Sequence, residues 1–270
     1  MPFSNLFPKE MKQGLQSLKV GKGYAWQGDF VLWQEASRGF QLNGTLRGKD
    51  FEVLGYQLNR LEGEIEASPE HVYLSNLRIE DEAGAIGIQK VELKRQASWS
   101  IFIPQILVRE LQPSLLRKVD GSSPPVKPFT IRNFLLKEIR GSVGDKSTLE
   151  AFGHLTFTNQ FKKGSSLLDL PLEMIKKIGL DPGMLTPVQG EFDLELRGDK
   201  FYLLTLSNAF SEGNRSEFYL APTSNLSYID LDGKMHIDLK LYQDVLLKLA
   251  EPFTLTIRGT LDKPRYGLQY

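Results

Sequence analysis

The sequence of 270 residues contains no cysteine. The chain therefore has no disulfide framework, no thiolate metal site and no cysteine nucleophile. Lysine plus arginine and aspartate plus glutamate both number 33, so the formal net charge is zero. Binding along a phosphate backbone requires a basic excess, which this chain lacks. We therefore expect no nucleic-acid partner.

Long hydrophobic segments are also missing. No stretch reaches the roughly 18 consecutive apolar residues of a membrane-spanning helix. Residues 1–8 lack the basic start and the apolar run of a secretory signal peptide. If the protein belongs to a cell envelope, we expect the segment that anchors it there to be absent from this chain. The composition itself, 41% hydrophobic and 24% charged, is typical of a globular protein.

Motifs that carry chemistry are scarce. No Gly-x-Ser-x-Gly elbow, phosphate loop or dinucleotide fingerprint occurs. The histidines are far apart and none has a His or Cys partner at ligand spacing, so we interpret each as a solvated residue. They are His71, His154 and His236. The acidic residues at 80–82 and at Asp230 and Asp232 fit charged turns better than acid–base or calcium sites. We expect no enzymatic activity, no catalytic residue, no metal and no cofactor.

Alternation of apolar and polar side chains recurs along the chain and predicts many β-strands, because successive strand residues point to opposite faces. The cleanest alternation gives one dry face. Its members are Phe192, Leu194, Leu196, Met235, Ile237, Leu239, Phe253, Leu255 and Ile257. A strand with one wet and one dry face is typical of antiparallel sheet that is covered on one side. The sequence therefore predicts a mainly β fold.

Turn residues divide the strands. Asp232-Gly233 predicts a hairpin turn. Gly48-Lys49-Asp50 and Gly198-Asp199-Lys200 predict two further reversals. The first of these lies in Leu46–Phe51, which Leu196–Phe201 echoes, a weak sign of internal duplication.

A linker rich in proline and serine, residues 121–128, predicts a division into an N-terminal β lobe of residues 1–120 and a C-terminal β lobe of residues 129–270. Helix is predicted to be sparse. The candidates are Lys9–Leu18, Leu167–Ile178, the short segment Gln243–Ala250 and a single turn within Pro113–Val119.

Two structures fit the dry face equally well. One is a closed sandwich core. The other is an elongated, curved antiparallel sheet whose concave face is an apolar groove, which suits acyl chains because they offer apolar area and no directional bonds.

The strand units between residues 39 and 95 resemble the repeats of the AsmA-like and TamB-like envelope proteins of Gram-negative bacteria. The resemblance is carried by runs such as Leu61-Glu62-Gly63-Glu64-Ile65-Glu66-Ala67-Ser68-Pro69 and Val72-Tyr73-Leu74-Ser75-Asn76-Leu77-Arg78-Ile79. Near the C-terminus, Gly259-Thr260-Leu261-Asp262-Lys263-Pro264 is similar to the Gly-Thr-Leu-x-x-Pro ending common in that family.

The resemblance implies a taco-like β-groove in the periplasm or cell envelope that carries phospholipid between membranes or assists outer-membrane biogenesis. The partners would be phospholipid or another acyl lipid, together with envelope membrane proteins. The dry-face residues then become the candidate lining of a lipid groove. Type II secretion subunit N resembles the same strand pattern, so a second hypothesis is a structural or scaffold subunit of an envelope or secretion complex. Such a subunit would bind a partner strand at an exposed sheet edge.

Overall fold

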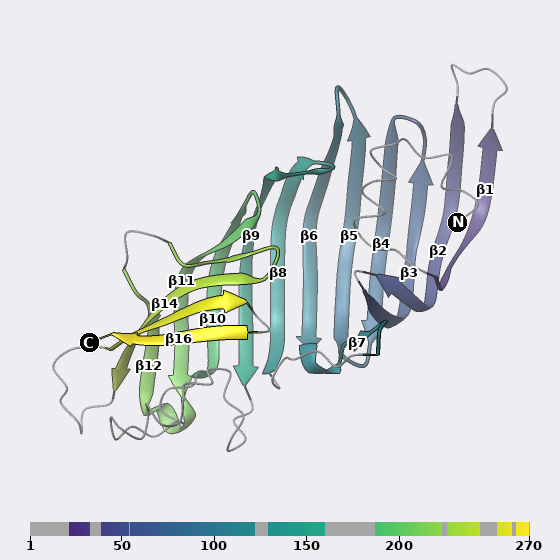
Figure 1. Cartoon of the computed structure of the whole chain (residues 1–270). Coiled ribbons are helices and arrows are strands. Elements are labelled where there is room, and N and C mark those ends of the chain that lie inside the picture. Colours follow the sequence, from purple (N-terminus) through teal and green to yellow (C-terminus); the bar gives the residue numbers. More distant parts are fainter. Residues whose placement is uncertain are drawn as a thin grey trace. The chain divides into compact units, whose positions relative to one another are not determined.

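The protein is mainly β, as the sequence predicts. The computed structural model describes residues 22–32, 39–53, 55–121, 129–159, 187–222, 226–243, 253–260 and 263–269. Within these ranges the regular structure is antiparallel sheet, and helix is confined to short 3-10 turns at Pro113–Leu115 and Glu212–Asn214 (Figure 1).

Most of the strands are long, and most are joined by tight turns. In chain order they are β1 Tyr24–Leu32, β2 Phe40–Val53, β3 Tyr56–Ala67, β4 His71–Asp81, β5 Gly84–Arg95, β6 Trp99–Leu111, β7 Arg117–Lys118, β8 Phe129–Ser142, β9 Asp145–Asn159, β10 Pro187–Arg197, β11 Lys200–Ser211, β12 Ser216–Leu220, β13 Tyr228–Asp230, β14 Lys234–Gln243, β15 Phe253–Thr260 and β16 Lys263–Gln269.

The chain forms two compact units. Unit 1 comprises Met1–Glu110, Leu115–Pro124 and Leu135–Ala151, and unit 2 comprises Leu111–Ser114, Pro125–Phe134 and Phe152–Tyr270. In unit 1, β1 to β6 form a meander in which each strand pairs with the next, and β7 adds to β3. In unit 2 the strand order runs from β10 to β12 and then from β14 to β16, while β13 pairs with both β11 and β14. Strands β8 and β9 each contribute residues to both units.

Several sequence predictions fall on undescribed positions. Residues 122–128 of the predicted linker lie outside the described residues, and the lobes 1–120 and 129–270 stay a prediction. The helices predicted at Lys9–Leu18 and Leu167–Ile178 also lie outside them. Of the segment Gln243–Ala250, Gln243 is the last residue of β14 and the rest is not described.

The hairpin turn predicted at Asp232-Gly233 is confirmed. It joins β13 to β14, and the N–H of Gly233 donates to the carbonyl oxygen of Asp230 at 2.8 Å. Gly233 has φ of +80°, a conformation that glycine adopts without steric cost. The reversal predicted at Gly198-Asp199 is likewise found between β10 and β11.

The reversal predicted at Gly48-Lys49-Asp50 is wrong. Strand β2 continues through these residues to Val53, and Gly48 and Phe51 pair with Leu61 and Leu58 of β3. Asp50 is left out of the pairing and has φ of +47°, while Lys49 and Phe51 on either side of it pair with Arg60 and Leu58 in one unbroken register. Aspartate tolerates the left-handed conformation, which is why turn-type residues occur here inside a strand. The echo between Leu46–Phe51 and Leu196–Phe201 therefore does not extend to the structure, because only the second contains a hairpin turn.

Two strands do contain a β-bulge next to a left-handed residue. Asn76 in β4 has φ of +52° beside a register shift against β3, and Asn208 in β11 has φ of +52° beside a register shift against β10. Each bulge inserts one residue, so the alternation of faces changes phase. As a result Leu206 and Ala209, three residues apart, are both buried. Strict alternation thus holds only between bulges.

Apolar side chains of neighbouring strands bury one another within each unit. In unit 1, Ala67, Val72 and Trp99 form a cluster against which Phe40 and Leu93 pack. In unit 2, Phe218 is 1% exposed. Large side chains of this kind contribute most of the hydrophobic stabilisation, about 1.5–3 kcal/mol each.

Candidate functional site

An apolar ladder crosses β12, β14 and β15 in unit 2. We use this name for Phe218, Ile237, Leu239, Leu241, Leu255 and Ile257, which are between 1% and 8% exposed. Ile237 lies opposite Ile257, and Leu239 lies opposite Leu255. Phe218 lies opposite Leu241. Because directly opposite residues of an antiparallel pair share a face, these pairs form one continuous apolar surface.

The structure brings the candidate lining residues together in two groups. Ile237, Leu239, Leu255 and Ile257 belong to the apolar ladder. Leu194 and Leu196 are buried in β10, where they lie opposite Leu203 and Phe201 of β11. The burial of these side chains agrees with the dry face that alternation predicts.

The remaining three candidates for the groove lining are not among the side chains that the structure describes as buried. Phe192 is half-buried and its ring stacks on that of Phe157, with 5.8 Å between the ring centroids. Met235 is half-buried in β14. Phe253 of β15 lies opposite Leu241 of β14, and the side chain of Phe253 is outside the described part of the structure.

Sequence reasoning did not place Phe218 and Leu241 in the lining. Leu241 continues the alternation of β14, so the same signal could have found it. Phe218 lies in the five-residue strand β12, where it is followed directly by Tyr219 and Leu220. In so short a strand the run of apolar residues hides the period of two.

The opposite face of β14 carries a buried ion pair. The guanidinium of Arg258 in β15 lies 2.6 Å from Asp238, whose side chain is only 8% exposed. Arg258 also donates to the carbonyl oxygens of Ile237 and Ile257, at 2.9 and 3.0 Å. His236 stacks on the ring of Tyr228 with 6° between the ring planes. Unit 2 thus separates an apolar face from a face of paired polar groups.

A second polar cluster joins β9, β10 and β11. His154 Nδ1 lies 2.8 Å from Asp193 Oδ1, and the hydroxyl of Thr205 donates to Asp193 Oδ2 at 2.7 Å. His154 Nε2 faces a second carboxylate, that of Glu191, at 4.0 Å. A hydrolytic triad needs a nucleophile at that nitrogen. The arrangement is therefore a link between strands, and the histidine is not simply solvated as the sequence suggested.

This cluster predicts a pH-dependent contribution to stability. Hydrogen bonds from His154 and then from Thr205 hold the pKa of Asp193 below its usual range. The carboxylate therefore stabilises the fold fully above its unfolded pKa of about 4, and this contribution is lost as the pH falls through the lower folded pKa. Asp193→Asn is expected to lower the urea midpoint of unfolding at pH 7, by an amount that shrinks below pH 4. Glu70→Gln, at an exposed turn, serves as the control, and a deficit independent of pH would contradict the assignment.

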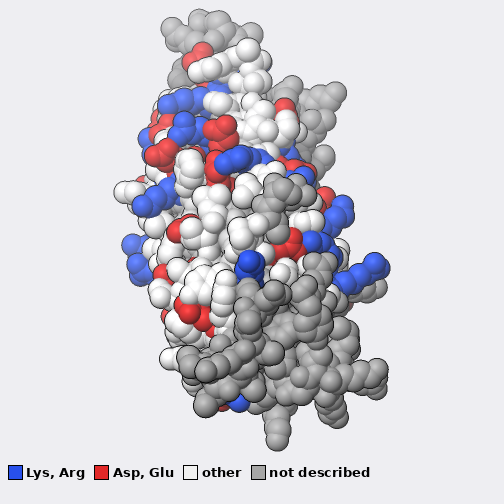
Figure 2. Space-filling view, turned by 90° about the vertical axis from the view of Figure 1, so that its left-hand side faces the viewer, with Lys and Arg blue, Asp and Glu red and all other residues white. Residues whose placement is uncertain are grey.

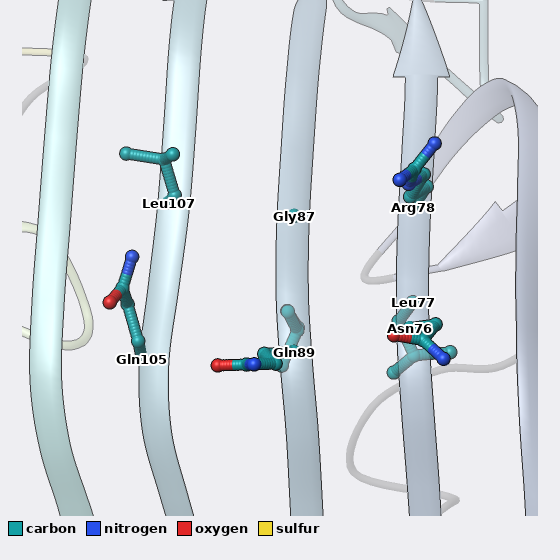
Figure 3. A pocket seen from close by; sticks show the side chains of 8 residues that line it. Asn76, Leu77, Arg78, Gly87, Gln89, Gln105 and Leu107 are labelled. Carbon is teal, nitrogen blue, oxygen red and sulfur yellow. The ribbon is translucent and has the colours of Figure 1, made fainter.

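A shallow hollow lies on β4, β5 and β6 of unit 1 (Figure 3). Its volume is about 250 Å³, and its lining residues are Asn76, Leu77, Arg78, Gly87, Ile88, Gln89, Gln105 and Leu107. Gly87, opposite Arg78 and Leu107, leaves the space open, since a Cβ there would meet only the carbonyl oxygen of Leu107, at 4.0 Å. Figure 3 shows Gln105, Gln89 and Asn76 on three adjacent strands. The hollow is smaller than the roughly 300–1,000 Å³ of ordinary ligand pockets, so we assign it no function.

The surface in view in Figure 2 carries basic and acidic side chains interspersed with uncharged ones. This mixture agrees with the formal net charge of zero. In the part of the chain that the structure describes, no group of three or more His, Asp or Glu side chains is placed to hold a metal ion. The same residues include no helix of the length and hydropathy needed to cross a membrane.

No protein-family model, no curated protein and no solved structure matches the chain.

Proposed function

We propose that the protein is an AsmA-like β-groove protein of the bacterial cell envelope that takes part in phospholipid transport or outer-membrane biogenesis. The observation that carries the proposal is the apolar ladder: branched and aromatic side chains form a surface across three strands, while charged side chains lie on the other face. A lipid acyl chain placed against such a surface gains about 0.8 kcal/mol for each CH₂ group it buries. Its head group would stay in water.

The mechanism is passive. The ladder has no catalytic group, and its side chains, now 1–8% exposed, would have to open to an acyl chain, whose burial there would lower the free energy of a lipid outside a bilayer without changing it chemically. The proposed location is the periplasm or cell envelope, with envelope membrane proteins as partners that deliver or receive the lipid.

A second candidate function is a structural subunit of an envelope or secretion complex that carries no lipid. The close burial of the ladder favours it, because Leu255 is 2% exposed and Ile237 is 8% exposed. Side chains that are already covered by protein atoms form a core, and a core contributes stability without any ligand.

Lipid content separates the two functions. The protein is purified without harsh detergent, and bound lipid is measured by native mass spectrometry and by extraction. Copurifying phospholipid is expected, and it should be lost in the variant Leu194→Asp with Ile237→Asp, provided that circular dichroism shows the variant to be folded. The matched control is Leu204→Asp with Leu231→Asp, which changes exposed positions of unit 2 and should keep the lipid. If the wild-type protein carries no lipid, the lipid-transport function is contradicted and the structural function is supported.

A further inference from the structure

We infer that strand β1 is a self-complementary edge through which two copies of this chain pair antiparallel. In the strand order of the described residues β1 stands first, and β2 is its partner along all nine of its residues. No strand among those residues pairs with its other edge. An unpaired edge presents a row of backbone N–H and C=O groups that can bind another strand. This inference uses the edge alone and does not depend on whether the apolar ladder holds lipid.

The first and last strands of the strand order, β1 and β16, differ in their content of charged residues and proline. Strand β16, which stands last, begins Lys263-Pro264-Arg265. Charged residues and a proline, which lacks an N–H donor, are the features that protect an edge from further pairing. Strand β1 has no proline and no basic residue, and Asp29 is its only charged residue. Of the two edges, β1 is the one that is open to a further strand.

The side chains of β1 are suited to continuing the sheet. Trp26 and Phe30 lie opposite Leu46 and Leu42 of β2, so they share the apolar face of that strand. Phe30 is 37% exposed although its ring contacts that of Phe40, and Val31 is 44% exposed. A strand added beside β1 would cover these two side chains.

Symmetry selects one register for a second copy. When Gly28 lies on a two-fold axis, all nine residues pair, and residues on the apolar face meet residues on the same face. Trp26 then lies opposite Phe30 of the second copy, which is a favourable cross-strand aromatic pair. Asp29 lies opposite Gln27 of the second copy. Moving the two-fold axis from Gly28 to Asp29 would place Asp29 opposite itself, and this like-charge pair disfavours that register.

Cysteine cross-linking tests the register, because the natural chain contains no cysteine. In the proposed dimer, position 25 lies opposite position 31 of the second copy, within the distance of about 4.4–6.8 Å between Cα atoms that a disulfide spans. The variant Ala25→Cys with Val31→Cys is expected to form disulfide-linked dimers under mild oxidation. Each single variant should cross-link at least about tenfold less, because its own positions are about 20 Å apart across the axis. Equal cross-linking of the single and double variants would overturn the register.

Charge substitutions at Gln27 test the same pairing without cysteine. Gln27→Glu places a carboxylate opposite Asp29 at both symmetric contacts, and Gln27→Lys places a cation there. Analytical ultracentrifugation of the full chain is expected to show dimer dissociation about fivefold easier for Gln27→Glu and about fivefold harder for Gln27→Lys. Both variants alter an exposed side chain, so their folding should not change. A wild-type chain that stays monomeric at all concentrations, or two variants that shift in the same direction, would overturn the inference.

Discussion

Replacing Phe218 by alanine is expected to lower the free energy of unfolding by about 4 kcal/mol, the largest effect of any single truncation in the apolar ladder. The Phe218 side chain is 1% exposed and lies opposite Leu241. Its removal loses the transfer free energy of the ring and leaves a cavity that the strands fill only in part. Urea denaturation followed by intrinsic fluorescence measures the change as a lower midpoint with an unchanged slope.

The matched control for this substitution is Phe152→Ala. Phe152 is in unit 2 as well, and its side chain is 53% exposed. Truncation there removes little buried area, so the change should stay within about 0.5 kcal/mol. Similar losses for the two phenylalanines would mean that the apolar ladder is not the core of unit 2.

Replacing Arg258 by methionine is expected to cost about 3 kcal/mol, because it leaves the buried carboxylate of Asp238 without its cation. A buried unpaired charge is destabilising even where the intact pair contributes little. Urea denaturation at pH 7 measures the loss.

A double variant separates the charge from the loss of packing. Asp238→Leu combined with Arg258→Met removes both charges, and we expect it to recover most of the stability that the single variant loses. Arg197→Met is the control for losing an arginine, because Arg197 pairs with Glu195 on the exposed surface. Its effect should be small, since solvent screens exposed pairs. If the double variant is as unstable as Arg258→Met alone, the stability depends on the hydrogen bonds of Arg258 and not on the pair.

The sequence predicts the class of fold and much of the strand pattern because both depend on local alternation. The turn at Asp232-Gly233 and the alternation in β14 are local signals, and the structure contains both. The turn prediction fails at Asp50, because a left-handed aspartate occurs in turns and inside strands alike, and only the register with β3 separates the two. Strand β16 was not predicted, since Pro264 near its start is typical of a strand end.

The site is less predictable than the fold, because its contacts join residues far apart in the chain. His154 and Asp193 are 39 positions apart, and neither belongs to a recognisable motif. Their contact follows from the strand order β9 to β11, which alternation alone does not give. The period of β14 predicts Asp238 on the wet face, but Asp238 is only 6% exposed. Its carboxylate contacts Arg258 from the next strand, a pairing that the sequence does not specify.

The bulges at Asn76 and Asn208 bear on how this chain tolerates insertions and deletions. In an unbroken strand, adding one residue turns every following side chain to the other face. A strand that already contains a bulge can absorb such a change by losing, gaining or moving the extra residue, and the side chains beyond it keep their places. Homologous strands could then differ in length by one residue while burying the same core. Alignments of this protein with its relatives should therefore place single-residue gaps at these two positions more often than elsewhere in β4 and β11.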